Sequence, residues 1–284
     1  MATLLKGKPV VDHMAVDLRS RIEALKSRGV EPTLALVRMG ERPDDLSYER
    51  TAKKRAASLG LSTKPYVLDD LAPQAAVLAT LQSINYDKTV HGCLMFRPLP
   101  SFIDEKALCN MLSPEKDIDG ISLASLASVF TDSSDGFPPC TAQACVEILD
   151  FYKIPLVGKH VVVIGRSLVV GKPVSMMLLR RNASVTICHS RTENLPELCR
   201  TADIVICAVG RAHAFGKEYF RAGQTVLDVG INFDSRGTLC GDVNFDEVEP
   251  VVDAITPVPG GIGTVTTSVT MAHVVDAAEK MTGR

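Results

Sequence analysis

At 284 residues the chain is longer than one typical compact domain, and a prior of about 150 residues per domain predicts two. Its formal net charge of −2 provides no basic excess for nucleic-acid phosphates, so we expect no nucleic-acid partner. The opening segment lacks the pattern of a signal or transit peptide, and no run approaches ~18 consecutive apolar residues. These features predict a cytoplasmic protein that makes no membrane contact.

Short apolar runs alternate with amphipathic helical stretches along the chain. The runs are rich in β-branched residues, as in parallel strands buried on both faces. They cover residues 33–40, 92–100, 160–165, 183–188, 202–210 and 224–232. Helical patterns occupy residues 11–28, 47–59, 72–84, 171–182, 194–201 and roughly 266–282. This alternation predicts an α/β fold.

A segment rich in turn-forming residues divides the chain. Residues 131–142, TDSSDGFPPCTA, concentrate Ser, Asp, Gly and Pro, which end regular structure. We place the domain boundary there. The expected domains are residues 1–138 together with 267–284, joined by a last helix that crosses back, and residues 139–266.

The cysteines show no spacing typical of a metal site or a disulfide framework. Several lie inside apolar runs, where a reduced thiol behaves as a small hydrophobic group. We therefore predict buried thiols, no disulfides and no metal site. The eight positions are Cys93, Cys109, Cys140, Cys145, Cys188, Cys199, Cys207 and Cys240.

Residues 161–178, VVVIGRSLVVGKPVSMML, read as strand, glycine turn and helix. Gly165 at the end of the strand would let the backbone approach a ligand, and the N-terminus of the next helix attracts phosphate. The pattern is a variant of the usual Gly-rich fingerprint, so a turn made only for packing remains an alternative. With the alternating pattern around it, it favours a Rossmann-like, doubly wound second domain.

The next predicted strand is followed by polar residues that favour NADP over NAD. About 20 residues past the glycine turn an NAD enzyme carries an acid for the ribose 2′-OH. This chain has Ser190 and Arg191 there, and a hydroxyl and a guanidinium suit a 2′-phosphate. Arg166 offers a second cation. Glu193 lies close in sequence, and a solvated polar loop is the alternative interpretation.

Ordered segments throughout the chain resemble the methylenetetrahydrofolate dehydrogenase/cyclohydrolase family. They are KGKPV, HGCLMFRPLP, PEKDIDG, PCTAQA, VVIGRSLVVGKP, CHSRT, ADIVICAVG, VLDVGIN, GDV and TPVPGGIG. The resemblance implies a two-lobed α/β fold, a homodimer, a tetrahydrofolate derivative as substrate, and NADP as cofactor on the second lobe. Its members oxidise 5,10-methylene-tetrahydrofolate to the 5,10-methenyl form, and many hydrolyse that product to 10-formyl-tetrahydrofolate.

The same resemblance implies catalytic roles for Tyr48, which would pack against the folate, and Asp119, which would hold the pterin ring. A tyrosine ring provides stacking area, and a carboxylate can accept two N–H bonds from the pterin edge. From the residues alone, a core tyrosine and a turn-forming aspartate before Gly120 are the alternatives. The other implied substrate contacts are Phe96, Pro98, Pro259, Gly260 and Gly261. The implied cofactor contacts are Gly165, Arg166, Ser167, Ser190, Arg191 and Ile231.

Two positions depart from the bifunctional members of the family. Those members carry a lysine four residues after the tyrosine and a glutamine two residues before PLP, where this chain has Ala52 and Phe96. Hydrolysis needs a group that transfers protons, whereas hydride transfer mainly needs two aligned rings. On a regular helix Lys53 and Lys54 point ~140° and ~120° away from Tyr48.

We therefore predict an NADP-dependent dehydrogenase that has lost cyclohydrolase activity. A bifunctional enzyme that uses Lys53 or Lys54 is one alternative. A folate- or nucleotide-binding paralogue without turnover is the other.

Overall fold

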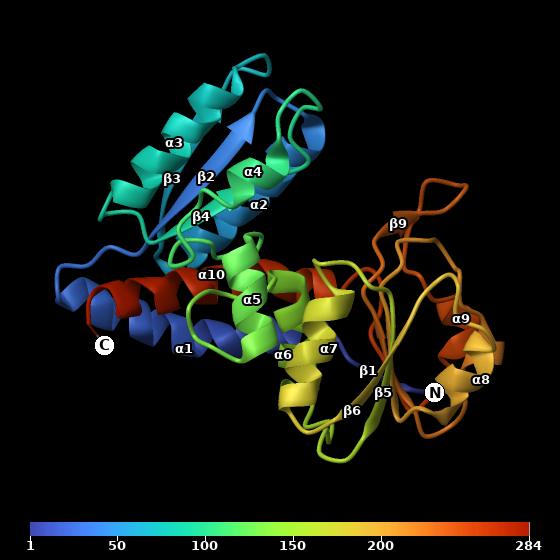
Figure 1. Ribbon diagram of the computed structural model, residues 1–284. Coiled ribbons are helices and arrows are strands. Elements are labelled where there is room, and N and C mark those ends of the chain that lie inside the picture. Colours follow the sequence, from blue (N-terminus) through green and yellow to red (C-terminus); the bar gives the residue numbers. More distant parts are fainter. Residues whose placement is uncertain (284) are drawn as a thin grey trace. The chain divides into compact units, whose positions relative to one another are not determined.

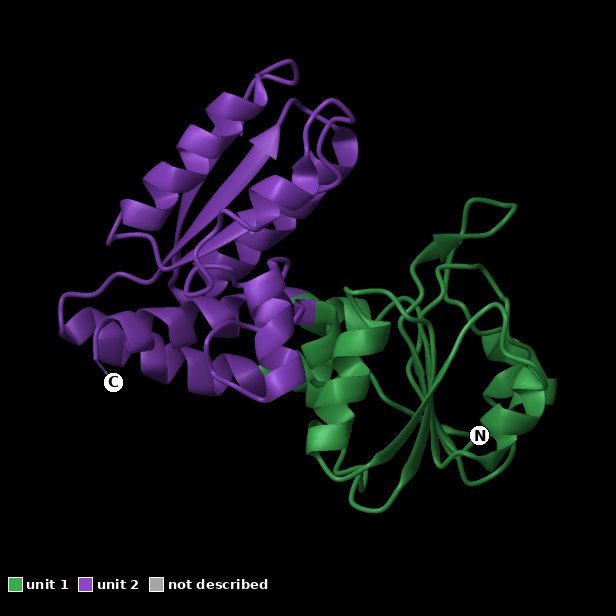
Figure 2. Cartoon of the chain, viewed as in Figure 1, with its two compact units in different colours: residues 1–12, 141–266 green, residues 13–140, 267–284 purple. Residues whose placement is uncertain are grey.

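The computed structural model describes residues 1–283, and the chain divides into two compact units (Figure 2). Unit 1 comprises Met1–Asp12 and Thr141–Thr266, and unit 2 comprises His13–Cys140 and Thr267–Arg284. Helices α1, Gly7–Ser27, and α10, Ile262–Met281, each begin in unit 1 and continue in unit 2. The chain therefore passes between the units inside regular helices as well as near residue 140.

Unit 2 contains a three-stranded parallel sheet in the order β3-β2-β4. Its strands are β2, Thr33–Met39, β3, Ser62–Leu68, and β4, Gly92–Met95. The predicted strand at 92–100 ends at Met95, since Pro98 and Pro100 lack the N–H that a ladder needs. Strand β3 was not predicted, because half of this edge strand is solvent-exposed and it contains Pro65.

Helices cover both faces of this sheet (Figure 1). Alternate residues of β2 enter two cores: Leu34 and Leu36 pack with α2 and α10, whereas Ala35 and Val37 pack with α3. Besides α1 and α10, the helices of unit 2 are α2, Pro43–Leu59, α3, Gln74–Tyr86, α4, Glu105–Cys109, and α5, Leu123–Thr131. The sheet thus fixes α2, which carries Tyr48.

Unit 1 contains a six-stranded parallel sheet in the order β1-β11-β8-β7-β5-β6. Its strands are β1, Thr3–Leu4, β5, His160–Ile164, β6, Ser184–Cys188, β7, Ile204–Cys207, β8, Thr225–Asp228, and β11, Ala254–Ile255. The chain moves from β5 to β6 on one side and then to β7 on the other, which is a topological switch point. The predicted α/β, doubly wound architecture is confirmed. Residues 1–12 lie in this unit because β1 pairs with β11.

The remaining elements of unit 1 surround this sheet. They are α6, Cys140–Phe151, α7, Gly171–Arg180, α8, Leu195–Thr201, α9, Phe245–Val248, the 3-10 turn Lys217–Tyr219, and a hairpin of β9, Asn232–Phe233, and β10, Leu239–Cys240. The predicted strand at 224–232 is interrupted after Asp228, whose carboxylate accepts the N–H of Gly230 and turns the chain.

All eight cysteines are buried free thiols, as predicted, and the apolar runs that contain them form the cores. Within residues 1–283 no cluster of three or more His, Cys, Asp or Glu side chains is arranged to hold a metal ion. Among the same residues, no helix has both the length and the apolar character needed to span a bilayer.

Candidate active site

The glycine turn after β5 is tightly packed. Gly165 has a φ of 134°, and a Cβ there would lie 2.3 Å from the carbonyl oxygen of Ala208. At the start of α7 a Cβ on Gly171 would lie 2.1 Å from the Gly165 oxygen. Only glycine fits these two positions, so strand and helix approach closely, as a dinucleotide-binding turn requires. Arg166 and Ser167 follow on the exposed side of the turn.

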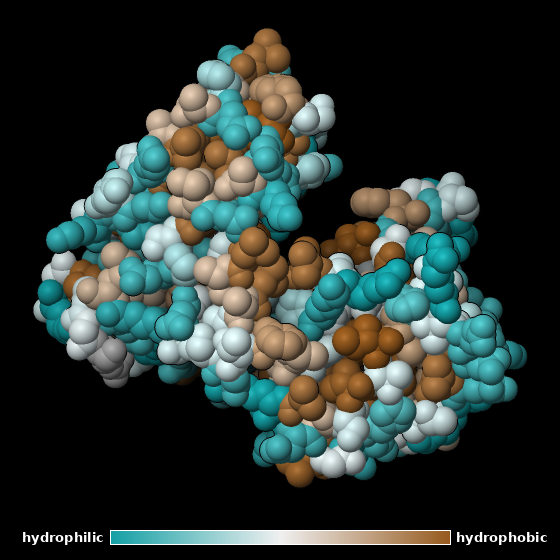
Figure 3. Space-filling view, in the orientation of Figure 1, coloured by the Kyte–Doolittle hydropathy of each residue, from teal (hydrophilic) through white to brown (hydrophobic). Residues whose placement is uncertain are grey.

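A second turn, after β6, lies beside the first. The two are joined because the N–H of Gly165 donates to the Cys188 carbonyl at 2.9 Å. The N–H of Arg191 donates to Nδ1 of His189 at 3.2 Å, which closes the second turn. Ser190 and Arg191 are exposed there. The structure thus brings the hydroxyls and guanidiniums predicted for the 2′-phosphate to one end of the sheet. Figure 3 shows hydrophilic and hydrophobic side chains interspersed on the surface in view.

A hollow of about 220 Å³ lies at the end of β8. Residues 228–231 and 257–264 line it, so it contains four predicted contacts, namely Ile231, Pro259, Gly260 and Gly261. Ile231 is 65 % exposed. A Cβ on Gly261 would lie 2.5 Å from the Pro257 carbonyl oxygen, so a side chain does not fit at that position. The walls are mainly backbone and aliphatic side chains, which suit a flat ring.

In unit 2, Tyr48 is held at both ends of its side chain. Its ring meets the Phe96 ring edge to face, with centroids 5.8 Å apart, a geometry worth about 0.5–1.5 kcal/mol. Its hydroxyl is hydrogen-bonded to Thr267 and Thr270 of α10, and burial raises the pKa of Tyr48, so the phenol stays neutral. The side chain is nevertheless 37 % exposed. Tyr48 therefore has a fixed ring that is partly open to solvent.

Asp119 lies near Tyr48, since its negative charge helps to raise the pKa of the Tyr48 phenol. Burial raises the pKa of Asp119 to about 6, and the charge of Arg97 partly opposes this rise. A guanidinium nitrogen of Arg97 lies 3.7 Å from the Asp119 carboxylate, which is 25 % exposed. Asp119 is therefore anionic at neutral pH and partly accessible.

A buried polar network supports these two residues, and sequence reasoning missed it. The Thr270 hydroxyl donates to Sγ of Cys140 at 3.4 Å, and Cys140 donates to the Ile118 carbonyl at 3.1 Å. Nδ1 of His273 lies 2.7 Å from the same carbonyl, adjacent to Asp119 in the chain. The signal was present in the sequence, because Thr267, Thr270 and His273 recur every three residues on an apolar helix.

The two lysines that follow Ala52 lie outside its buried surroundings. Helix α2 includes both Tyr48 and Ala52, and Ala52 is completely buried in the apolar core. Nζ of Lys53 contacts the Glu49 carboxylate, which also accepts Nε of Arg38 at 2.7 Å. The side chain of Lys54 is exposed to solvent.

Phe96 and Pro98 line a hollow of about 530 Å³ in unit 2. Phe96 itself is only 5 % exposed and contributes to the core beside Ala52. Arg42, which also lines this hollow, binds both oxygens of the Asp45 carboxylate at 2.8 and 2.9 Å. The positive charge of Arg42 in this hollow is thus balanced by the Asp45 carboxylate.

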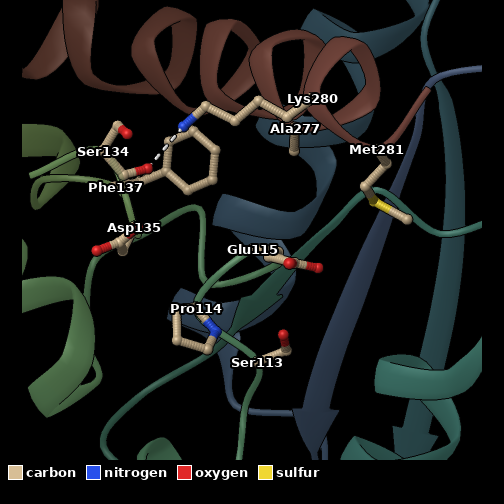
Figure 4. Close-up of a pocket in the computed structure, with 10 residues that line it drawn as sticks. Ser113, Pro114, Glu115, Ser134, Asp135, Phe137, Ala277, Lys280 and Met281 are labelled. Carbon is tan, nitrogen blue, oxygen red and sulfur yellow. Dashed lines mark hydrogen bonds between the residues drawn. The ribbon is translucent and has the colours of Figure 1, made fainter. Parts of the chain in front are cut away.

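Another hollow in unit 2, of about 320 Å³, has walls from residues 113–115, 134–137 and the end of α10 (Figure 4). Its Lys280 ammonium donates to the Ser134 carbonyl at 3.1 Å and lies 4.8 Å from the centre of the Phe137 ring. These contacts anchor α10 to the loop. None of the predicted contacts is among the residues that line this hollow.

Comparison with known proteins identifies the family. The catalytic-domain model described as tetrahydrofolate dehydrogenase/cyclohydrolase matches residues 5–119, and its NAD(P)-binding-domain model matches residues 139–282. The chain belongs to the tetrahydrofolate dehydrogenase/cyclohydrolase family. These matches confirm the resemblance found in the sequence, and they confirm an enzyme with an NADP-binding, Rossmann-like domain.

Relatives in this tetrahydrofolate dehydrogenase/cyclohydrolase family match over their whole length. The bifunctional protein FolD of Carboxydothermus hydrogenoformans is 50 % identical, with 100 % of this chain and 99 % of the relative covered. The crystal structure of bifunctional FolD from Campylobacter jejuni has a TM-score of 0.95 at 34 % identity, with 99 % of each chain covered. The Trypanosoma brucei enzyme, complexed with NADP and an inhibitor, has a TM-score of 0.92 at 30 % identity, with 100 % of this chain and 99 % of that chain covered.

Proposed function

We propose that this enzyme oxidises 5,10-methylene-tetrahydrofolate to 5,10-methenyl-tetrahydrofolate with NADP, and that it lacks cyclohydrolase activity. As the family resemblance implies, it acts as a homodimer, and we place it in the cytoplasm. The observation that supports the lack of cyclohydrolase activity is the buried methyl group of Ala52, one helical turn after Tyr48. A proton-transferring lysine occupies that place in bifunctional members.

The residues of unit 2 bind and orient the folate. Tyr48 stacks against it, and the Asp119 carboxylate accepts N–H bonds from its pterin edge. Burial of Asp119 supports this role, because a hydrogen bond to a charged group is stronger where water is partly excluded.

The residues of unit 1 hold the cofactor. The backbone at Gly165 and Ser167 faces the pyrophosphate, Ser190 with Arg166 and Arg191 binds the 2′-phosphate, and the hollow of Ile231 and Gly260 takes the nicotinamide. Bound NADP supplies the hydride acceptor. The protein's task is then alignment of two rings, which needs no acid or base.

Hydrolysis of the methenyl product makes a different demand. Water must lose a proton and a ring nitrogen must gain one, so a titrating group has to lie near the bridge carbon. Ala52 and Phe96 cannot titrate, and Lys53 is already bound to Glu49. These contacts support loss of the second activity.

Bifunctional activity is the second candidate, and the names of the relatives favour it. It would require Lys53 to leave Glu49, or Lys54 to turn from solvent toward Tyr48. The long lysine stem makes this motion sterically accessible.

An engineered variant tests the assignment of Ala52. Ala52→Lys with Phe96→Gln should install enzyme-dependent decay of methenyl-tetrahydrofolate, measured by loss of its absorbance. Overpacking at this fully buried position should also cost about 1–3 kcal/mol of stability, visible as a lower Tm. Phe96→Gln alone is the matched control and should install none. A folded double variant that keeps dehydrogenase activity but hydrolyses nothing would show that position 52 does not decide the activity.

A further inference from the structure

Two carboxylates that the proposed function leaves unused lie buried at the end of β8. Asp242 is 0 % and Asp228 is 4 % exposed. The Asp228 carboxylate accepts three backbone N–H groups, from Gly230, Asp242 and Val243, at 2.9–3.0 Å. Its hydrogen-bond partners are thus dipoles rather than cations.

The Asp242 carboxylate is held in a similar manner. It accepts the backbone N–H groups of residues 209–211 at 2.6–3.1 Å and the side-chain amide of Asn232 at 2.9 Å. A Cβ on Gly230 would lie 2.4 Å from Asp242, and one on Gly241 would lie 1.9 Å from Asp228. The surrounding backbone is shaped to hold two negative charges.

The strand order places these charges at one end of the dinucleotide site. If the 2′-phosphate lies beyond β6 and the pyrophosphate beyond β5, the nicotinamide continues to the far side of β5, over β7 and β8. There Asp228 lines the hollow that also contains Ile231 and Gly260. This step rests on the proposed function of the hollow.

We propose that the Asp228 carboxylate, supported by Asp242, makes this hollow selective for the oxidised over the reduced nicotinamide. The oxidised ring carries a positive charge and the reduced ring is neutral, while the rest of the two cofactors is the same. A fixed negative charge that is itself shielded from water therefore attracts one form more than the other. Asp228 acts on cofactor specificity, and Asp242 is a positioning residue.

The pKa of Asp228 gives this selectivity a pH dependence. Burial raises the pKa of Asp228 to about 6; the three backbone hydrogen bonds oppose this rise, and the charge of Asp242 adds to it. Selectivity is present where Asp228 is ionised, above that pH, and is lost below it. Other titratable groups near Asp228 are the Cys207 and Cys240 thiols, whose pKa values burial raises and the charge of Asp228 raises further. Asp228 also lines a neighbouring hollow together with His213, Asp234 and Arg236.

Binding measurements test the proposal without turnover. Titration calorimetry would give the Kd of oxidised and reduced NADP for the natural protein and for Asp228→Asn. We expect the Kd of the oxidised form to rise about 10-fold, while the Kd of the reduced form changes less than about 2-fold. Asp246→Asn, which removes an exposed charge of the same unit, should change neither. Equal weakening of both forms by Asp228→Asn would overturn the proposal.

In Asp228→Asn the new amide would face backbone N–H groups and can disturb the loop. A second measurement therefore uses the natural protein. The ratio of the two Kd values should shift toward the oxidised form as the pH rises through about 6. The 2′-phosphate titrates in both cofactors and cancels in the ratio. His213→Asn should show the same shift. A ratio that is constant with pH would overturn the proposal but not the proposed function, whereas failure of both cofactors to bind would contradict both.

Discussion

The two units build their parts of the site by different means. In unit 1 the predicted contacts lie on consecutive turns at the ends of neighbouring strands, where glycines remove side chains and the polar groups are exposed. In unit 2 the contacts are side chains from distant segments, held by buried partners such as Thr270 and Cys140. We expect the first kind of site to tolerate the loss of one ligand-facing side chain better than the second kind does.

This difference predicts which substitutions should be most costly. An exposed cation in unit 1 contributes one contact to a large ligand. A side chain in unit 2 such as Asp119 has a defined environment and cannot be replaced by a neighbour. Mutations should therefore affect folate turnover more strongly than cofactor binding.

The largest effect is expected for Asp119→Asn. The amide has one acceptor oxygen where the carboxylate has two, and its NH2 group would face a donor on the pterin, so kcat/KM for the folate should fall about 100-fold or more. The Kd of NADP should stay unchanged, because Asp119 belongs to the other unit. Steady-state kinetics with calorimetry would check both values. Near-normal folate kinetics would mean that Asp119 only forms a turn.

A smaller effect is expected for the exposed cations of unit 1. Arg166→Ala or Arg191→Ala removes one charge-assisted contact with the 2′-phosphate and should raise the KM of NADP about 10- to 100-fold. Kinetics with NAD should barely change, since NAD lacks that phosphate. Arg181→Ala, which breaks an ion pair with Asp150 elsewhere in unit 1, is the control. If NAD and NADP were affected equally, these residues would not form a 2′-phosphate site.

The dependence of folate kinetics on pH should report Asp119 of unit 2 near pH 6, where Asp228 of unit 1 also titrates. Because the pKa of Asp119 is raised to about 6, its carboxylate gains a proton as the pH falls through that value and stops accepting N–H bonds. With saturating NADP, kcat/KM for the folate should drop about tenfold per pH unit below 6. Asp119→Asn should lack this limb. The same limb in the variant would assign the titration to another group.

The smallest effect is expected for Thr270→Val. The change removes a hydroxyl between Tyr48 and Cys140 while keeping its shape, at a cost of about 1 kcal/mol. The KM of the folate should rise a few-fold while NADP kinetics remain constant. Thr282→Val, whose hydroxyl bonds only to α10 carbonyls, serves as the control. An unchanged folate KM in Thr270→Val would show that the network does not position Tyr48.

The fold of unit 1 could be predicted from the sequence because its signals are local. Continuous apolar strands and a glycine turn at Gly165 define strand, turn and helix without long-range information. Strand β3 escaped prediction because its edge position allows polar residues and Pro65, which obscure the apolar pattern.

The site of unit 2 was less predictable from residues alone. The hydrogen-bond partners of the Tyr48 hydroxyl come from α10, more than two hundred residues away, and neither Thr267 nor Thr270 forms a recognisable motif with it. The position of Ala52 relative to Tyr48 could be predicted, because α2 is a regular helix and places the two residues one turn apart. The ion pair of Lys53 with Glu49 follows the i, i+4 spacing of α2 and could have been predicted, whereas the contact of Glu49 with Arg38 of β2 is tertiary and no spacing rule reveals it.

The most direct test follows both reactions with the purified natural protein. It should form NADPH from 5,10-methylene-tetrahydrofolate, while methenyl-tetrahydrofolate decays no faster than in matched buffer without enzyme. General acid–base help is typically worth ~10²–10⁴-fold, so its absence would be plain in the absorbance trace. Lys53→Met and Lys54→Met should leave dehydrogenase kcat nearly unchanged. Enzyme-dependent decay by the natural protein, abolished by either lysine substitution, would contradict the account and establish a bifunctional enzyme.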